Sequence, residues 1–269
     1  MAKKNQIVTE VRRICNLVQS RGTENDWKFD DALSSGALGA VAAVPPSKDL
    51  RQAWWKVGDQ GSTGSCVGWA STEGVMRYHL VMAGKVAQKE SLSPRYTWMA
   101  SKEIDEFVSR PETFIEEAGT SLKAAMDVCR KYGVVLESAL PFPINTLMYT
   151  GDENQFYAAA AQRRAAAYFN LGKNLNQWRT WLASNGPILA GISVDATWDN
   201  AKATHGVLDV FQPNTVRGGH AVCVVGYRGD NRFIIRNSWG TSWGDKGFAY
   251  ASEAYIKAAF FNESYGISL

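Results

Sequence analysis

One cysteine lies where its side chain can act as a nucleophile. Cys66 stands in GSTGSCVGWA, between a run of small turn residues and a long helical pattern. A thiol attacks carbonyl groups well only as a thiolate, and a free thiol with a pKa of about 8.5 is mostly protonated at neutral pH. The unpaired N–H groups in the first turn of a helix favour an anion. The sequence therefore offers a nucleophile that still needs a base.

Three histidines are candidates for that base. His79 lies 13 residues further along the same predicted helix, about 20 Å away, so it cannot contact Cys66. His205 lies in a segment without a clear pattern. His220 opens the strand-like HAVCVVGY, and the turn RGDNR sends the chain back as FIIRNSWG. A two-residue hairpin loop would put Asn237 on the same face as His220, where its amide fixes the imidazole tautomer, whereas a three-residue loop would separate them.

Acyl transfer also needs hydrogen-bond donors for the charge that develops on the carbonyl oxygen. Gln60 lies six residues before Cys66 in the same loop, and its side-chain NH₂ can turn back toward the thiol. The backbone N–H of Cys66 offers a second donor. Nucleophile, base, orienting amide and donors together indicate thiol-dependent acyl transfer. An inert buried thiol, the usual interpretation of a lone cysteine, is then the poorer hypothesis.

Three segments carry a family resemblance. DQGSTGSC before a helix, GGHAVCVVGY and RNSWGTSWGDKGF resemble the signature blocks of the papain-like cysteine peptidases, in the family order, and the resemblance begins near Val44. It implies that Cys66 is the nucleophile, His220 the general base and acid, Asn237 the orienting residue and Gln60 an oxyanion donor. No metal ion or other cofactor is implied, and the partner is a peptide or protein substrate.

The resemblance also implies substrate-binding residues. Trp239 would shield the histidine and asparagine, Trp243 would line the leaving-group side, and Gly119 in EAGTSLKAAMDVCRKYGV would anchor a bound peptide through its backbone. Thr63 stands where secreted members carry a disulfide cysteine, which argues against a lysosomal type. The pattern is similar to bacterial-type members that lack the usual long propeptide.

The composition excludes several other classes. The net charge of +3 and the lack of a Lys/Arg block argue against nucleic-acid binding. The four cysteines form no CxxC and the histidines no paired spacing, so we expect no metal site. Cys15, Cys129 and Cys223 are interpreted as buried hydrophobes, and the remaining tryptophans as packing residues. Without a bilayer-spanning run or a signal-peptide pattern, we expect a cytoplasmic protein with reduced thiols.

The hydrophobic pattern divides the chain into unlike parts. We expect helices over residues 66–83, 91–107, 119–133, 155–169 and 176–186, and strands over 188–194, 220–227, 232–239 and 247–252. This predicts an α+β, papain-like fold in two lobes with a cleft between them. The helical lobe covers about 60–150, and the strand-rich, barrel-like lobe covers about 151–269 plus 44–59.

Residues 1–43 form an N-terminal extension in this interpretation, and residues 44–269 the peptidase domain. Helical spacing of apolar residues predicts an amphipathic helix over 1–20, whereas the Ala, Gly and Ser of 31–47 favour an extended chain. The extension either packs permanently outside the lobes or lies along the cleft and limits access, as a short propeptide does.

The predicted reaction is peptide-bond hydrolysis through a thioester acyl-enzyme. Two alternatives stay open at this point. Other acyl transfers, such as deamidation, transpeptidation or isopeptide cleavage, use the same groups, because the triad does not choose between water and amine acceptors. A catalytically silent interaction module is disfavoured, because Gln60, Cys66, His220 and Asn237 are all intact.

Overall fold

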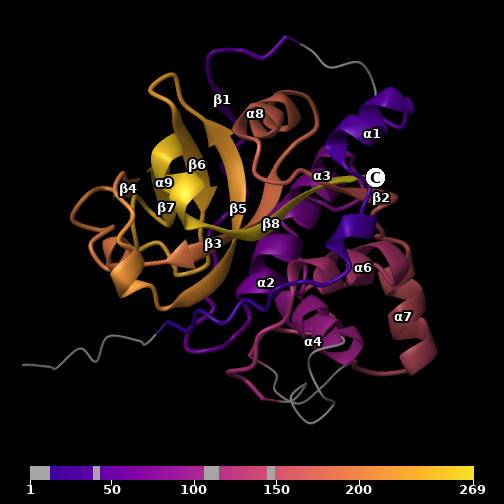
Figure 1. The fold of residues 1–269 in the computed structure, drawn as a ribbon. Coiled ribbons are helices and arrows are strands. Elements are labelled where there is room, and N and C mark those ends of the chain that lie inside the picture. The colour runs from indigo at the N-terminus through magenta and orange to yellow at the C-terminus, as the bar shows by residue number, and fades with distance from the viewer. Residues whose placement is uncertain (1–12, 39–42, 106–114, 144–148) are drawn as a thin grey trace, which may run out of the picture.

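Helices and strands occupy different sides of the molecule (Figure 1). The computed structural model describes residues 13–38, 43–105, 115–143 and 149–269. The helices that begin near Cys66 lie on one side and a large sheet lies on the other. This is the α+β arrangement of a helical and a strand-rich part that the sequence predicts.

The central helix begins at Cys66 and passes through three conformations. It consists of α2 (Cys66–Gly68), a π-helical stretch η2 (Trp69–Met76) and α3 (Arg77–Met82). All but a few of its side chains are buried, as expected of a helix enclosed on all sides. The single helix predicted over 66–83 is therefore confirmed, apart from its π-helical turns.

Two further helices pack beside the central one. α4 (Pro94–Ile104) begins with a proline in its first turn, and its cap Ser93 accepts a hydrogen bond from the Tyr96 N–H. α6 (Leu122–Lys131) is capped by Ser121, which accepts from the Ala124 N–H. Both were predicted from their apolar spacing.

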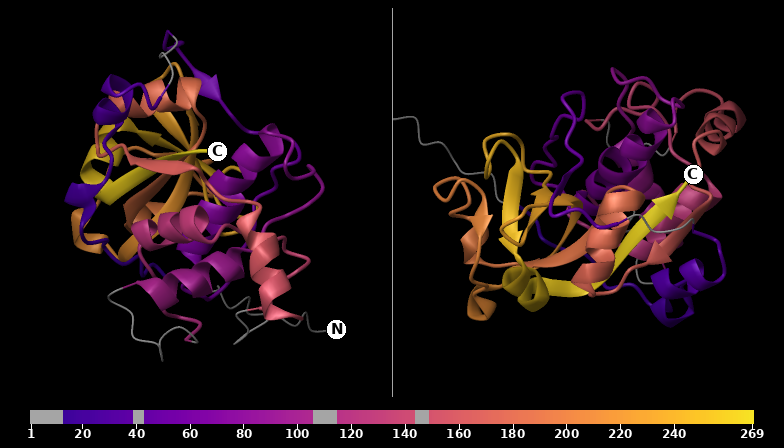
Figure 2. Two further views of the ribbon diagram at one scale, coloured as in Figure 1. Left: turned by 90° about the vertical axis from the view of Figure 1, so that its right-hand side faces the viewer. Right: turned by 90° about the horizontal axis from the view of Figure 1, so that it is seen from above.

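The sheet contains eight strands in the described part of the chain, and Figure 2 shows it from two other sides. The order is β2-β8-β3-β5-β6-β7-β4, β1 pairs with β5, and every pairing is antiparallel except β4 with β7. The bounds are β1 (Lys48–Asp49), β2 (Ala167–Asn170), β3 (Ile188–Val194), β4 (Val207–Leu208), β5 (Gly218–Tyr227), β6 (Arg232–Arg236), β7 (Phe248–Ser252) and β8 (Phe260–Ser268).

Shorter helices cover the remaining surfaces. Their bounds are α1 (Phe29–Ser34), α7 (Glu153–Ala161), α8 (Leu175–Ser184), α9 (Glu253–Ala259) and the 3₁₀ turns η1 (Thr23–Asn25), η3 (Ala196–Trp198) and η4 (Pro213–Thr215). The helix predicted over 155–169 is wrong in its second half, because residues 167–170 form β2. There the backbone pairs with β8, a long-range contact that local alanine content cannot reveal.

The N-terminal predictions need two corrections. Residues 1–12 of the predicted amphipathic helix lie outside the described residues, and residues 13–18 are extended rather than helical. Their backbone donors bond to the body of the protein, with the Leu17 N–H 2.9 Å from Gly219 O and the Val18 N–H 3.1 Å from Thr120 O. The extended chain predicted over 31–47 is wrong at its start, because the residues up to Ser34 belong to α1. Phe29 of this helix packs edge-on against Trp181.

One continuous apolar core joins the two sides. It includes Val75 and Met76 of η2 and Val222 and Val224 of β5, all buried. Within the described residues, no helix has the length and apolar character needed to cross a bilayer. The same ranges hold no cluster of three or more His, Cys, Asp or Glu side chains suited to a metal ion.

Candidate active site

His220 and Asn237 meet because of a bulge in the hairpin that carries them. The β5–β6 loop has three residues, since the Arg228 N–H bonds to Arg232 O at 2.8 Å. A regular ladder with such a loop would put His220 and Asn237 on opposite faces. The register shifts by one residue between Val224 and Gly226, which restores the shared face. The two-residue loop expected from the sequence is therefore wrong, but the bulge places His220 and Asn237 on one face all the same.

The hydrogen bonds around Asn237 define the tautomer of His220. His220 Nε2 lies 2.8 Å from Asn237 Oδ1, and the Ser238 N–H donates to the same oxygen at 2.8 Å. Because the backbone donor identifies that atom as the amide oxygen, Nε2 must carry the proton. Nδ1 then has a lone pair, and it is buried with no hydrogen-bond partner among the described residues. His220 is therefore arranged to accept a proton at Nδ1.

Two tryptophans pack on the His220 ring, and a third packs behind them. The Trp239 ring centroid lies 5.0 Å from that of His220, and the Trp198 ring meets it at 90° and 5.6 Å. Trp243 stacks on Trp198 at 5.2 Å and donates its indole N–H to Trp198 O at 2.9 Å. Trp239 therefore covers the histidine as the resemblance implied. The Trp243 ring packs on the rings of Trp198 and Trp239 rather than on His220 itself.

Trp198 is a site residue that the sequence reasoning missed, because it was grouped with the packing tryptophans. Its indole N–H donates to the Tyr255 hydroxyl at 2.8 Å, and that hydroxyl donates to Asp195 at 2.6 Å. All three residues are fully buried. This chain of hydrogen bonds fixes the plane of the Trp198 ring, and hence one wall around His220. No local pattern links 198 to 255.

Cys66 begins the central helix with its side chain fully buried. Burial raises the pKa of its thiol to about 12, although the backbone N–H of Ala221, next to His220 on β5, acts in the opposite direction. Burial also lowers the pKa of His220 to about 4, although the hydrogen bond that His220 donates to Asn237 acts in the opposite direction. Both groups are therefore neutral at pH 7 in this structure. The helix start alone does not produce the thiolate that the sequence argument expected it to favour.

Gln60 is held rigidly beside the Asn237 loop. Its backbone N–H donates to Ser238 O at 2.8 Å, and the Ser238 hydroxyl donates to Gln60 Oε1 at 2.8 Å. The side-chain amide is thereby oriented with Nε2 outward. Nε2 donates to Thr63 O at 2.9 Å and to the carbonyl oxygen of Ile14 at 3.3 Å. The donor predicted for a substrate oxygen thus contacts a peptide carbonyl of the chain's own N-terminal part.

That carbonyl belongs to residues 13–18, which we call the crossing segment. At its start Arg13 forms an ion pair with Asp59 and donates to Trp239 O at 3.2 Å. Figure 1 shows the segment in indigo, running from the strand-rich side toward the helices. It therefore spans the two parts of the molecule next to Gln60 and Trp239.

Glycines allow the crossing segment to approach closely on both sides. A Cβ at Gly119 would lie 2.0 Å from Asn16 O, and a Cβ at Gly218 would lie 2.0 Å from Cys15 O. Any side chain at either position would push the segment away. Gly119, expected to anchor a bound peptide, does lie against a peptide backbone. Cys15 was predicted on a helix face, and lies instead in this extended stretch beside Gly218.

Leu17 and Val18 continue the contacts on opposite sides. Leu17 is buried against Gly191 of β3, where one of its methyl groups lies 2.8 Å from the position that a Cβ on Gly191 would take. The Leu17 N–H donates to Gly219 O. Val18 forms a parallel bridge with Ser121. The segment is therefore held by backbone bonds to both the helical and the strand-rich part.

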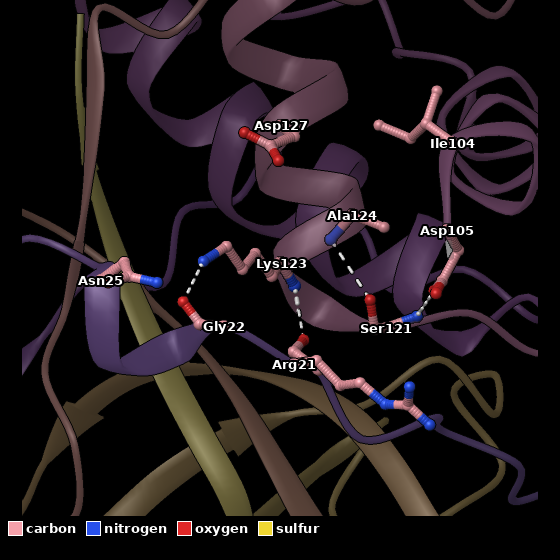
Figure 3. Close-up of a pocket in the computed structure, with 10 residues that line it drawn as sticks. Arg21, Gly22, Asn25, Ile104, Asp105, Ser121, Lys123, Ala124 and Asp127 are labelled. Atoms are coloured by element: carbon pink, nitrogen blue, oxygen red, sulfur yellow. Dashed lines mark hydrogen bonds between the residues drawn. The ribbon is translucent and has the colours of Figure 1, made fainter. Parts of the chain in front are cut away.

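Residues 20–26, the anchoring loop, tie the next stretch to α6 and β8. Figure 3 shows Lys123 beside Gly22, to whose carbonyl its ammonium donates at 2.7 Å. The same ammonium pairs with Asp26 at 2.5 Å. A polar hollow of about 250 Å³ lies between this loop and the start of α6. The Ser20 N–H also reaches the buried Glu263 at 3.1 Å, which links the loop to the sheet.

The other candidates lie elsewhere. His79 is buried against Tyr78 and has its pKa lowered to about 4 by desolvation, so it is a neutral packing residue. His205 is exposed and has a positive φ of 51°. Cys129 and Cys223 are buried in the core, as predicted.

Known proteins are similar to this chain in sequence. The profile of the papain family cysteine proteases matches residues 44–264. Cysteine proteinase 1 of Dictyostelium discoideum is 26% identical over 225 residues, 78% of this chain and 61% of that protein. Cathepsin K of Mus musculus is 32% identical over 219 residues, 77% of this chain and 59% of that protein. This chain thus spans about three fifths of the length of these relatives.

Solved structures share the fold across almost the whole chain. Xylellain, a cysteine protease from Xylella fastidiosa, has a TM-score of 0.80 at 20% identity and covers 98% of this chain and 99% of its own. Digestive procathepsin L 3 of Tenebrio molitor has a TM-score of 0.64 at 20% identity and covers 86% and 72%. With the profile match over most of its length, the chain belongs to the papain family of cysteine proteases.

Proposed function

We propose that this protein is a cysteine endopeptidase in which Cys66, His220 and Asn237 form the catalytic triad and Gln60 donates to the oxyanion. The observation that carries the proposal is the contact of Gln60 Nε2 with Ile14 O. It supports a site that receives a peptide carbonyl at the donor, in the loop that leads to the thiol.

The reaction follows from the arrangement of the protons. His220 Nδ1 accepts the Cys66 proton, and the sulfur attacks the substrate carbonyl carbon to give a tetrahedral oxyanion. Gln60 Nε2 and the Cys66 N–H donate to that oxygen. The C–N bond then breaks as the imidazolium returns its proton to the leaving amine, which leaves a thioester. Water, deprotonated by His220, attacks the thioester and releases the acid and the thiol.

Asn237 and Trp239 support the imidazolium in these steps. The Nε2–H to Oδ1 bond keeps the ring oriented while Nδ1 gains and loses its proton. The indole of Trp239 is buried, with its ring centroid 5.0 Å from that of His220, and it limits the access of water to that hydrogen bond. Neither residue exchanges a proton with the substrate.

We also propose that the crossing segment inhibits the enzyme from within the chain. It occupies Gln60 Nε2, lies against Gly119 and contacts Trp239, which are three positions assigned to substrate. A tethered segment acts at high effective concentration, so individually weak contacts suffice to exclude substrate. The anchoring loop and α1 continue as packing elements, so we assign inhibition to residues 13–18 and a structural role to the residues after them.

A shortened chain that begins at Arg21 separates the two proposals. It keeps Asp26 and Phe29, which pack on the body, and removes the contacts at Gln60. We expect faster labelling of Cys66 by an epoxysuccinyl probe and a higher kcat/KM on peptides than in the full chain. Equal labelling rates at a lower melting temperature would show a structural segment without inhibition. Absence of labelling in both chains would contradict the peptidase itself.

The acceptor is tested with the same shortened chain. Product masses from a peptide digest, with and without an added primary amine, distinguish hydrolysis from transfer. We expect hydrolysis products under both conditions, with Cys66→Ala as the inactive control. Amine-bearing products in the majority would assign the site to transpeptidation.

A further inference from the structure

A second concave site lies on the helical side, among residues that contact neither Cys66 nor His220. It is formed by one face of α4, the end of α6 and one face of α7, and it encloses about 640 Å³. That volume is typical of pockets that hold small organic ligands. Four tyrosines line it, namely Tyr96, Tyr132, Tyr149 and Tyr157. The helical faces follow the expected spacing, with Tyr96, Ala100 and Glu103 on α4 and Glu153, Tyr157 and Ala161 on α7.

The tyrosine rings are inclined rather than stacked. The ring planes of Tyr96 and Tyr157 make an angle of 55° with centroids 6.4 Å apart, and those of Tyr149 and Tyr157 make 51° at 6.2 Å. Phe156 packs edge-on against Tyr96 at 5.7 Å and against Tyr157 at 5.5 Å, and so holds both rings from behind. Inclined rings around a hollow form the walls of a cage.

The hydroxyl groups of these four tyrosines form no hydrogen bond with any described residue. Tyr96 is only 1% exposed as a residue, but its hydroxyl is not among the fully buried polar atoms that lack a partner. Of the six tyrosines elsewhere, all but Tyr78 donate to a carboxylate or a carbonyl, namely Tyr168, Tyr227, Tyr250, Tyr255 and Tyr265. These four hydroxyl groups therefore keep hydrogen-bonding capacity for a ligand in the pocket.

The charge at this site is mainly negative. Glu103 and Glu153 lie at the pocket on facing helices. Burial and the negative charge of Glu153 raise the pKa of the Tyr157 phenol, and Glu103 adds to the effect, so both carboxylates act on the same ring. Lys131 also lines the pocket, but its ammonium lies 3.6 Å from Asp127 on the same helix.

We propose that this tyrosine pocket binds an organic ammonium group carried on an apolar body. Aromatic faces attract a cation through their quadrupole, and the carboxylate of Glu153 at the pocket adds a favourable negative charge. The phenol oxygens can accept hydrogen bonds from an N–H of the ligand. The cation is either a free quaternary ammonium compound or the alkylated side chain of a lysine, which share this chemistry.

The charge requirement is tested by calorimetric titration of the full chain with choline and with its uncharged isostere 3,3-dimethyl-1-butanol. We expect saturable binding of choline and an affinity for the isostere that is lower by roughly tenfold or more, since only choline gains the cation–π attraction. A parallel titration with an acetylated trimethyllysine methylamide distinguishes the two sources. Tighter binding of the lysine compound assigns the pocket to a side chain, and tighter binding of choline to a free compound.

Matched variants locate the binding site. Tyr157→Leu keeps the bulk but removes the ring, and we expect choline binding to weaken roughly fivefold or more. Glu153→Gln should weaken it as well, whereas Glu24→Gln, at an exposed glutamate outside the pocket, should leave it unchanged. Hydrolysis of peptides by the shortened chain should be the same in all three. Equal affinity for choline and its isostere, no saturable binding of any compound, or full affinity in Tyr157→Leu would overturn the proposal.

Discussion

The side-chain nitrogen of Gln60 lies 3.3 Å from the carbonyl oxygen of Ile14, a residue of the N-terminal segment. Ser238 holds the amide in this orientation through a 2.8 Å hydrogen bond to Oε1. An oxyanion donor that is already bonded to the chain's own backbone is closed to substrate. The same geometry therefore supports both the assignment of Gln60 and the inhibitory role of the crossing segment.

Cys66→Ala should reduce peptide hydrolysis to background, because it removes the only proposed nucleophile. The side chain is smaller and buried at a helix start, so we expect an intact fold. The assay is hydrolysis of a fluorogenic peptide by the shortened chain, with a melting curve as the control for folding. Residual turnover above that of a buffer blank would falsify the mechanism.

His220→Ala should lower kcat by a factor on the order of 10² to 10⁴, the usual contribution of a positioned acid or base. Asn237→Ala should cost less, because the base remains and only its orientation is lost. His205→Asn is the matched control, since asparagine tolerates the positive φ at this exposed position. A severe loss in His205→Asn would show that the wrong histidine has been assigned.

Gln60→Ala should have opposite effects in the two forms of the protein. In the shortened chain, the loss of one oxyanion donor should lower kcat by about 10²-fold with little change in KM. In the full chain, the loss of the bond to Ile14 should speed the labelling of Cys66. Steady-state kinetics measure the first effect and probe labelling the second. An unchanged kcat in the shortened chain would mean that backbone donors are sufficient.

Tyr255→Phe should destabilise the protein and disturb His220 indirectly. It leaves the buried Trp198 indole N–H without a hydrogen bond and removes one of the three hydrogen bonds that the buried Asp195 accepts. Each such loss costs about 1 to 3 kcal/mol of unfolding free energy. We also expect a displaced acidic limb in the pH profile of kcat/KM, because the Trp198 ring packs on the imidazole. Urea denaturation and a pH series measure the two effects, and an unchanged pH profile would leave Trp198 with a packing role alone.

Closure of the N-terminal segment should weaken as pH rises. The Tyr265 hydroxyl lies 2.8 Å from both Asp26 Oδ2 and Glu263 Oε2, and its single proton can serve only one of them. Asp26 is paired with Lys123, and burial raises the pKa of Glu263, so the expected pH dependence is that of Glu263. Because the pKa of Glu263 is raised in the folded protein, its protonation stabilises the closed N-terminal segment, and this stabilisation is complete below the unfolded-state pKa of the carboxyl. It is lost as pH rises through the higher folded value.

The measurement is the rate of Cys66 labelling in the full chain divided by the rate in the shortened chain, across neutral and acidic pH. Taking the ratio cancels the effect of pH on the ionisation of the Cys66 thiol, which is common to both chains. We expect it to increase with pH in the natural sequence and to vary much less in Glu263→Gln, which cannot lose a proton. A ratio that falls as pH rises would assign the opposite sign to this contact.

The residues that we propose for catalysis could be selected from the sequence because each lies in a local pattern. The turn before Cys66, the helix after it, and the strands around His220 and Asn237 are set by short-range preferences for turns, helical spacing and alternation. These preferences correctly predicted the central helix, α4, α6 and four of the strands. They do not reach pairings such as β2 with β8, whose partners lie about a hundred residues apart in the chain.

The tertiary structure decided how those residues meet. The bulge between Val224 and Gly226 brings His220 to the same face as Asn237, although the loop has the length that should separate them. The crossing segment has helical apolar spacing, but it is extended, because Gly119 and Gly218 let its backbone approach both sides. Local propensities are worth only tenths of a kcal/mol per residue, and long-range backbone pairing and burial outweigh them. The sequence by itself determined which groups are candidates for the chemistry, while their register, neighbours and exposure depended on contacts between distant parts of the chain.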